Sequence, residues 1–152
     1  DGGTRSVFRA MAEKGVVWYP TLAAVEAISS YSGWEKGKDP EPTRITVKKA
    51  AMKVALEEGV LIGMGGDVGV YSHGKNAWEM ELMVEYGMSP LHVMRATTSL
   101  NARTFHLSDR GTIEVGKLAD LVGMTGDPTE NIKDAWNVTF VMKGGEIVRH
   151  DN

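Results

Sequence analysis

The chain begins with a segment of helical spacing, which a short apolar run follows. Residues 5–14 place their apolar side chains near helical spacing, and Gly15 follows as a stop signal. This pattern predicts an amphipathic helix. Residues 16–19 form a β-branched and aromatic run that Pro20 closes, which is typical of a buried strand.

A second helix and a second strand follow a stretch without a regular pattern. Residues 23–42 are rich in Ser, Gly and Pro, and they predict a long loop with a helical turn, at most, over residues 23–28. Helical spacing resumes over residues 43–58, and the apolar run 60–64 predicts another strand. The order helix, strand, loop, helix, strand indicates parallel βα units, so the predicted fold class is α/β.

The pattern changes again towards the C-terminus. We predict a helix over residues 76–86 whose apolar residues belong to the core, a helix that starts at Ser89-Pro90, and a helix over 99–105. Beyond Gly111 the chain predicts short strands separated by glycine turns, at residues 112–115, 118–124, 138–143 and 146–149. The predicted domains are therefore an α/β part, residues 1–108, and a small β part, residues 109–152.

Composition and charge exclude several classes of function. With 42% hydrophobic and 24% charged residues, the chain should form a packed core. Its 17 Lys and Arg against 20 Asp and Glu, without a basic run, argue against a nucleic-acid partner. No apolar run reaches the roughly 18 residues that span a membrane. Without cysteine, thiolate nucleophiles and cysteine metal sites are excluded, and His and carboxylate sites remain.

Asp67 is the strongest candidate for a catalytic residue. It follows the apolar run 60–64 and two glycines, a place where α/β barrels put catalytic groups and where backbone can approach a ligand closely. A carboxylate there can bind a divalent metal and accept a proton from an attacking water. An Asp that caps the next helix or fixes a turn fits the same spacing, so both interpretations stay open.

Two further residues are candidates for contact with a small-molecule substrate. His73 lies in the same glycine-containing loop as Asp67, although a solvent-exposed loop histidine has the same signature. Tyr19 ends the first predicted strand together with Pro20 and Thr21, where side chains would line a pocket at the strand ends. A proline at that point can also serve only to shape the turn.

Several ordered stretches carry a resemblance to a known family. They are VVWYPTL (16–22), IGMGGDVGVYSHGKN (62–76), ELMVEYGMSPLHVMRATTSLNAR (81–103), GTIEVGKLADLVGMTGDP (111–128) and FVMKGGEIV (140–148). Together they resemble the amidohydrolase superfamily, in the branch that holds imidazolonepropionase-like enzymes and Xaa-Pro dipeptidase-like hydrolases. Because the stretches occur in the family's order and cover nearly the whole chain, the resemblance is specific.

The resemblance implies a distorted eight-stranded (β/α) barrel of the TIM type with one or two divalent metals, usually zinc. Residues 16–22 would be its seventh strand and residues 60–64 its eighth, and Asp67 would bind metal and accept the proton of the attacking water. Residues 1–108 would be the C-terminal part of the barrel, and residues 109–152 would add strands to a small β-sandwich. The implied reaction hydrolyses a carbon–nitrogen bond in a cyclic amide or a dipeptide.

The chain also departs from the family pattern. The family's His-x-His pair of strand one, the bridging residue of strand four and the histidines of strands five and six have no counterpart, since all four histidines lie at or beyond His73. We therefore expect a C-terminal fragment that is inactive alone, from a parent whose homo-oligomeric state is open. The alternative is a non-catalytic truncated barrel module that acts through protein–protein association at its open strand edges.

Overall fold

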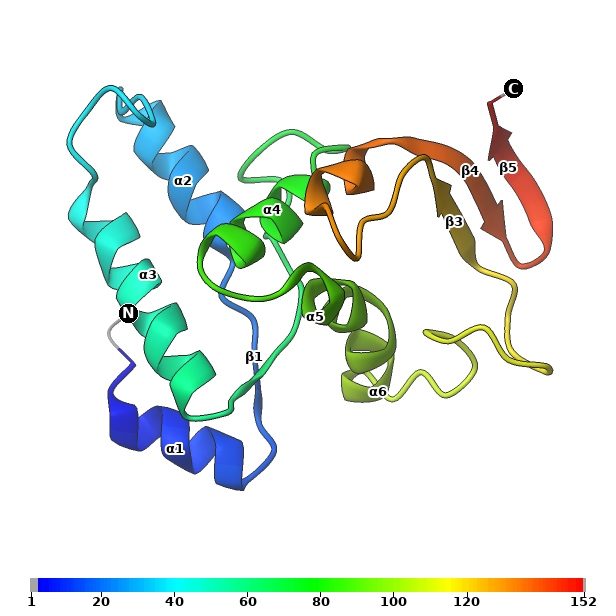
Figure 1. Cartoon of the computed structure of the whole chain (residues 1–152), viewed down its shortest axis with the longest axis horizontal. Coiled ribbons are helices and arrows are strands. Elements are labelled where there is room, and N and C mark those ends of the chain that lie inside the picture. The colour runs from blue at the N-terminus through cyan, green and yellow to red at the C-terminus, as the bar shows by residue number, and fades with distance from the viewer. Residues whose placement is uncertain (1–2, 152) are drawn as a thin grey trace. The chain divides into compact units, whose positions relative to one another are not determined.

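The computed structural model describes residues 3–151 and divides the chain into two compact units, Asp1–Met88 and Ser89–Asn152. Figure 1 follows the order of the helices and strands along the chain. Among the described residues, no helix combines the length and the apolar character that crossing a membrane requires. The predicted domain limits, 1–108 and 109–152, stay a prediction about the family's domains.

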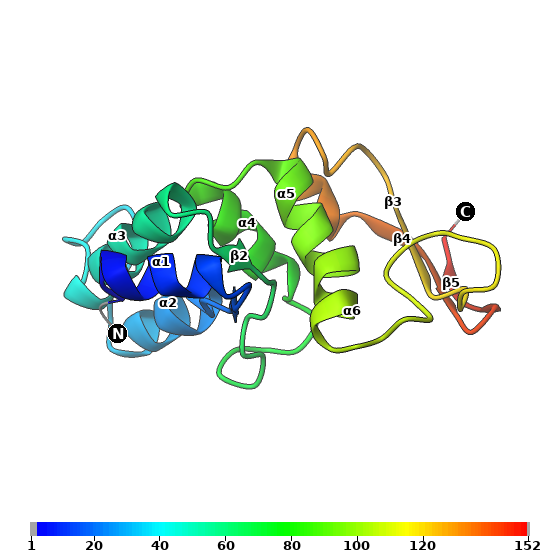
Figure 2. The ribbon, with the colours of Figure 1, turned by 90° about the horizontal axis from the view of Figure 1, so that it is seen from below.

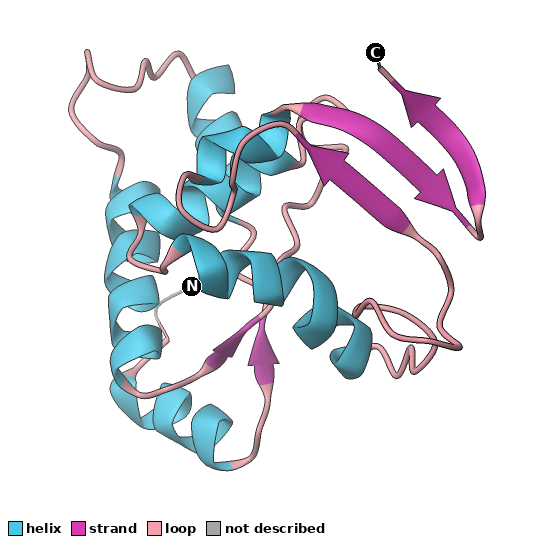
Figure 3. Ribbon diagram, turned by 45° about the vertical axis from the view of Figure 1, so that its right-hand side comes forward, coloured by secondary structure: helices cyan, strands magenta, loops and turns pink. Residues whose placement is uncertain are grey.

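The first unit contains four helices and a pair of short strands. In chain order they are α1 (Arg5–Glu13), β1 (Val17–Trp18), α2 (Leu22–Tyr31), α3 (Thr43–Glu57), β2 (Leu61–Ile62) and α4 (Ala77–Glu85). Strands β1 and β2 are parallel, with Val17 opposite Leu61 and Trp18 opposite Ile62 (Figure 3). The structure thus confirms the α/β class.

Helices of the first unit bury their apolar side chains against one another. Helix α3 contacts both α1 and α2, and α2 also contacts α4 (Figure 2). The largest apolar side chains that this core buries fully include Leu22, Ile45, Met52, Leu82 and Met83. At the surface, Arg5 and Arg9 of α1 form ion pairs with Glu58, which follows α3. Such exposed pairs add little stability, so apolar burial holds the unit together.

Helix α2 occupies the stretch that the sequence predicted to be mainly loop, and that prediction was wrong. Residues 22–31 are helical and bury side chains around most of the helix, including those of Ala23, Ala24, Ala27 and Ser29. Polar Glu26 and Ser29 are buried while apolar Ile28 and Tyr31 are exposed, so this helix shows no amphipathic period. The predicted helices over 5–14, 43–58 and 76–86 are confirmed within one or two residues at their ends.

The second unit begins with a continuous helical segment and ends with a sheet. Its elements are α5 (Pro90–Arg95), a π-helical turn η1 (Ala96–Leu100), α6 (Asn101–Thr104), β3 (Leu121–Met124), a 3-10 helix η2 (Ile132–Trp136), β4 (Val138–Lys143) and β5 (Glu146–His150). The predicted start at Ser89-Pro90 is confirmed, since Ser89 Oγ accepts a hydrogen bond from the His92 backbone N–H at 3.4 Å. The sheet is antiparallel in the order β3-β4-β5 (Figure 3).

One predicted strand of the second unit does not form. Residues 112–115 belong to a loop, and Ile113 is 88% exposed. Within the described part of the chain no neighbouring strand pairs with this segment, and an apolar run without a partner cannot complete a ladder. His106 lies just beyond α6 in the left-handed conformation, with φ 57°.

The core predicts a contrast between two isoleucines of the first unit. Ile45 of α3 is fully buried, whereas Ile28 of α2 is 40% exposed. Ile45→Ala should lower the free energy of unfolding by about 2–5 kcal/mol, because it removes buried methyl groups and leaves a cavity. Ile28→Ala, the matched control, should cost less than about half of that. Urea denaturation measures both, and equal losses would contradict the assigned core.

Candidate active site

The carboxyl ends of β1 and β2 bring two distant segments of the first unit to one edge. The register pairs Trp18 with Ile62, and the Gly63 backbone N–H donates to the Trp18 carbonyl at 2.9 Å. The chain continues from β1 into the Thr21 turn, residues 19–23, and from β2 into the Asp67 loop, residues 63–71. Because parallel strands end on the same side, this edge is where the fold can gather functional groups.

Asp67 projects from this edge with its side chain exposed. Its backbone is left-handed, with φ 59°, which is uncommon for a residue other than glycine. The Asp67 carbonyl accepts a hydrogen bond from the Val70 N–H at 3.2 Å and so closes a turn. The next helix starts only at Ala77, with Asn76 as its N-cap, so Asp67 caps no helix. Within residues 3–151 no hydrogen bond or ion pair engages its carboxylate, which leaves it available to a ligand.

Of the two other predicted site residues, one lies in the Thr21 turn and the other lies just beyond the Asp67 loop. Tyr19 is half-buried in the Thr21 turn, and its ring lies against Gly65, where a Cβ would be 3.3 Å from Tyr19 Cδ1. His73 is exposed, two residues beyond the Asp67 loop. The structure therefore brings Tyr19 to the segment that leads to Asp67. The roles of Asp67, His73 and Tyr19 stay predictions.

Glu79 is a buried residue for which the sequence pattern predicted no role. It lies on α4, its side chain is 0% exposed, and its carboxylate accepts the backbone N–H groups of Leu22 at 3.0 Å and Ala23 at 2.7 Å. Burial raises the pKa of Glu79 to about 7, although the two N–H groups and Lys48 favour the charged form. The only signal in the sequence was a carboxylate within the apolar stretch of a helix.

Tyr71 closes the Asp67 loop against Glu79 and Gly66. A Cβ added at Gly66 would overlap Tyr71 Oη and lie 3.1 Å from Glu79 Cβ, so only glycine fits there. Tyr71 is 5% exposed, and its hydroxyl has no hydrogen-bond partner among the described residues. Burial, with the carboxylates of Glu79 and Asp67 nearby, raises the pKa of this hydroxyl.

Comparison with known proteins shows which family the chain belongs to. A model described as the amidohydrolase family matches residues 6–148. The chain belongs to the amidohydrolase family. No curated protein gives a significant match. The family confirms the resemblance that the ordered sequence stretches indicated.

Solved structures of similar proteins extend the assignment. A Xaa-Pro dipeptidase with bound methionine in its active site is 33% identical, with a TM-score of 0.81 over 95% of this chain and 37% of that one. A. niger ochratoxinase is 25% identical, with a TM-score of 0.80 over 99% of this chain and 36% of that one. A prolidase complexed with N-methylphosphonate-L-proline shares the fold at 22% identity, with a TM-score of 0.80 over 97% and 38%. This chain thus spans less than two-fifths of their length.

Amidohydrolases typically bind a divalent metal, and the described residues can be tested for one. Between residues 3 and 151, no three His, Cys, Asp or Glu side chains converge so that they could hold a metal ion. A stable zinc site takes several ligands in a fixed geometry. The exposed Asp67 carboxylate therefore fits the contribution of one ligand, and the described residues do not fit a complete site.

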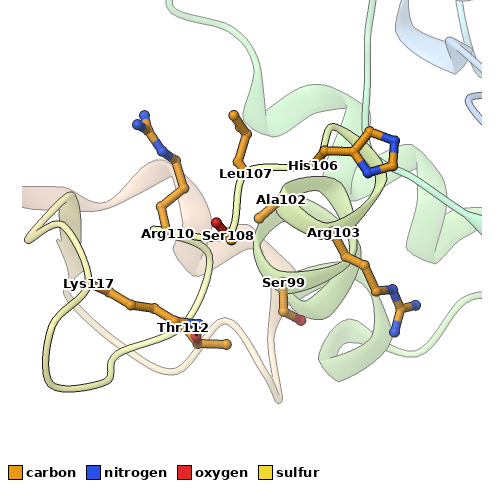
Figure 4. Close-up of a pocket in the computed structure, with 9 residues that line it drawn as sticks. All are labelled: Ser99, Ala102, Arg103, His106, Leu107, Ser108, Arg110, Thr112 and Lys117. Atoms are coloured by element: carbon orange, nitrogen blue, oxygen red, sulfur yellow. Dashed lines mark hydrogen bonds between the residues drawn. The ribbon is translucent and has the colours of Figure 1, made fainter.

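This amidohydrolase chain also has a pocket of about 420 Å³ in its second unit. It is lined by Ser99, Ala102, Arg103, His106, Leu107, Ser108, Arg110, Thr112 and Lys117. Arg103 and His106 point away from Lys117 and Thr112 (Figure 4). Arg110 pairs with Asp109 at 2.9 Å, and Lys117 donates to Thr112 Oγ1. The cationic side chains of this pocket thus either bind a neighbouring residue or point in different directions. None of Asp67, His73 and Tyr19 lines the pocket.

Gly66 and Tyr71 should be coupled in their effect on stability. Gly66→Ala should lower the free energy of unfolding by about 1–3 kcal/mol, because the new methyl group overlaps Tyr71 Oη. Tyr71→Phe alone should be nearly neutral, since it removes a buried hydroxyl without a partner among the described residues. The double variant should recover part of the loss. A double-mutant cycle by urea denaturation checks this, and strictly additive effects would contradict the contact.

The raised pKa of Glu79 predicts a pH-dependent stability. The folded chain holds this proton up to about pH 7, whereas an unfolded glutamate releases it near pH 4.5. Between these values the folded state binds more protons, so the free energy of unfolding should fall as pH rises, by up to about 3 kcal/mol. Glu79→Gln should flatten this part of the profile. Denaturation at pH 5 and pH 8 measures it, and identical slopes in both proteins would rule out the Glu79 contribution.

Proposed function

We propose that this chain supplies the last two barrel strands and one catalytic carboxylate of a metal-dependent hydrolase that cleaves carbon–nitrogen bonds. The observation that carries the proposal is the parallel pair β1–β2, whose carboxyl end presents the exposed Asp67 carboxylate. Catalytic groups of (β/α) barrels lie at that end of the strands. Membership of the amidohydrolase family and the similarity to a Xaa-Pro dipeptidase support the same conclusion.

In this proposal Asp67 has two tasks. One is to act as a ligand of a divalent metal, zinc by family resemblance, which acidifies a water and polarises the amide carbonyl when bound. The other is to accept the proton of the attacking water on a carboxylate oxygen and to deliver it to the leaving amine nitrogen. Exposure suits both tasks, because a partnered carboxylate would have to give up that partner first. Tyr19, from the Thr21 turn, and His73, from just beyond the Asp67 loop, contact the substrate.

The substrate class follows from the family and remains broad. We propose a small molecule with a cyclic amide or a dipeptide bond, since the similar solved proteins include a Xaa-Pro dipeptidase. The other metal ligands would come from a longer form of the polypeptide, because the similar structures are more than twice as long as this chain. Homo-oligomerisation of that longer parent belongs to the same proposal, and it has to be tested on the longer protein.

The longer form can be tested directly at the level of the gene. Translation upstream of the codon for Asp1 should give about 250 further residues with an early His-x-His and two later strand-end histidines. A stop codon immediately upstream would remove the catalytic proposal. The non-catalytic association module would then become the leading hypothesis.

Asp67 should be essential in that longer protein. Asp67→Asn should lower kcat for hydrolysis of a prolyl dipeptide by roughly 10²- to 10⁴-fold, because the amide cannot accept the proton. Asp39→Asn is the matched control: Asp39 is exposed in the first unit and accepts the Glu35 N–H at 2.8 Å, a bond that Asn can keep. The control should stay within about two-fold of the parent. Full activity of the Asp67 variant would refute the proposed role.

The association module rests on a separate observation. Several apolar side chains of the β3-β4-β5 sheet are exposed, with Val122 at 56%, Ile147 at 59% and Val148 at 68%. Exposed apolar side chains on a sheet with an open edge favour association. Light scattering of the purified chain separates the two functions: a defined oligomer without bound metal favours the module, and an aggregate argues against it.

A further inference from the structure

The Thr21 turn has an unusual arrangement at the start of α2. Thr21 is the N-cap residue of this helix, and threonine commonly caps a helix with its own hydroxyl. Here its backbone is left-handed, with φ 50° and ψ 54°, and its side chain makes no capping hydrogen bond. For a β-branched residue this conformation is a steric outlier. The rest of the unit must therefore hold it in place.

Glu79 takes over the capping role from a position far away in the sequence. Its carboxylate receives the first two N–H groups of α2, from Leu22 and Ala23, across 57 and 56 residues of chain. A carboxylate in the protein interior is unfavourable unless charged or polar groups compensate for it. A capping hydroxyl from Thr21 could accept only one N–H group, that of Ala23 or Ala24, without burying a charge. The Glu79 carboxylate binds the first two N–H groups together and also links α4 to the start of α2.

Lys48 holds the other side of the same turn. Its ammonium group donates to the Pro20 carbonyl at 2.9 Å, so polar backbone groups on both sides of Thr21 are bound by side chains from other helices. Lys48 also faces Glu79 closely enough for the two charges to attract. The pair thus compensates charge within the unit while it fixes the turn.

The same glutamate also contacts the Asp67 loop. Its Cβ lies 3.1 Å from the point where a Cβ on Gly66 would be, directly before Asp67. Among the described residues, only Thr21, Asp67 and His106 are left-handed without being glycine. Two of these three residues, Thr21 and Asp67, therefore lie in the two segments that Glu79 contacts. Backbone strain of this kind is retained where function requires it.

We propose that Glu79 is a positioning residue, whose carboxylate fixes the Thr21 turn and whose stem fixes the Asp67 loop, so that both present their side chains at the same end of β1 and β2. This inference rests on the proposed function for its catalytic consequence only. Thr21 is thereby freed from helix capping, and its hydroxyl becomes a second polar group at the edge that holds Asp67. The geometric part can be tested on the 152-residue chain without any activity.

Amide hydrogen exchange of the unaltered chain is the first test. First-turn N–H groups of a helix lack an intrahelical acceptor and usually exchange fast. Leu22 and Ala23 should instead be protected about ten- to a hundred-fold more than Thr43 and Arg44, which open α3 without a side-chain cap. Equal, fast exchange at both helix starts would overturn the proposal.

Glu79→Gln at pH 8 is the second test, with Glu26→Gln as its control. Glu26 is also buried, at 2% exposed, but it binds Lys36 at 2.8 Å and Tyr86 at 3.2 Å. The Glu79 variant should lose most of the protection at Leu22 and Ala23 and shift the amide signals of residues 66–68. The control should change neither, even where its unfolding midpoint falls as far. Unchanged signals in the Glu79 variant, or equal changes in both, would overturn the proposal.

The longer enzyme separates this inference from the proposed function. There Glu79→Gln should lower kcat about ten-fold and leave KM within about two-fold, since misplacement of the reacting group affects the chemical step. An unchanged kcat would overturn the catalytic part. A longer protein without hydrolase activity would refute the proposed function and leave the exchange result intact, whereas fast exchange at Leu22 and Ala23 would refute only the positioning role.

Discussion

Glu79 links three helices of the first unit to the segments that follow β1 and β2, through its carboxylate on one side and its Cβ on the other. It comes from α4, receives the N–H groups that open α2, and lies near the ammonium group of Lys48 on α3. Because an unpaired buried charge is costly, each of these partners has to stay where it is. The strands β1 and β2 contribute only two residues each to their ladder. The hydrogen bonds of Glu79 therefore help to fix the segments that follow these short strands.

A division between buried and exposed carboxylates follows from this arrangement. Glu79 has its partners inside the protein, and burial raises its pKa. Asp67 projects into solvent without a partner among the described residues and stands on a strained backbone. Gly66, between the strand and Asp67, leaves room for the Tyr71 hydroxyl. The buried group suits support and the exposed group suits chemistry, as expected of a site built on a rigid edge.

Local signals predicted the helices that have a polar face or a strong start. Ser89-Pro90 predicted the start of α5, because the serine hydroxyl acceptor and the fixed φ of proline both act within one turn of the chain. The prediction failed for α2, whose cap comes from Glu79, and for residues 112–115, which have strand-forming residues without a strand partner. In both cases a partner outside the segment decides the outcome: for α2 it is a distant carboxylate, and for residues 112–115 it is a pairing strand that the described residues do not supply. A local pattern carries no information about such partners.

The sequence by itself determined the α/β class, the family and the position of Asp67 after an apolar strand, since periodicity and ordered motifs are properties of neighbouring residues. Only the tertiary structure decided that Asp67 is exposed, that Thr21 is left-handed, and that Glu79 binds the Thr21 turn from more than fifty residues away in the sequence. Such contacts depend on the distance between side chains in space. That distance is fixed only when the helices pack.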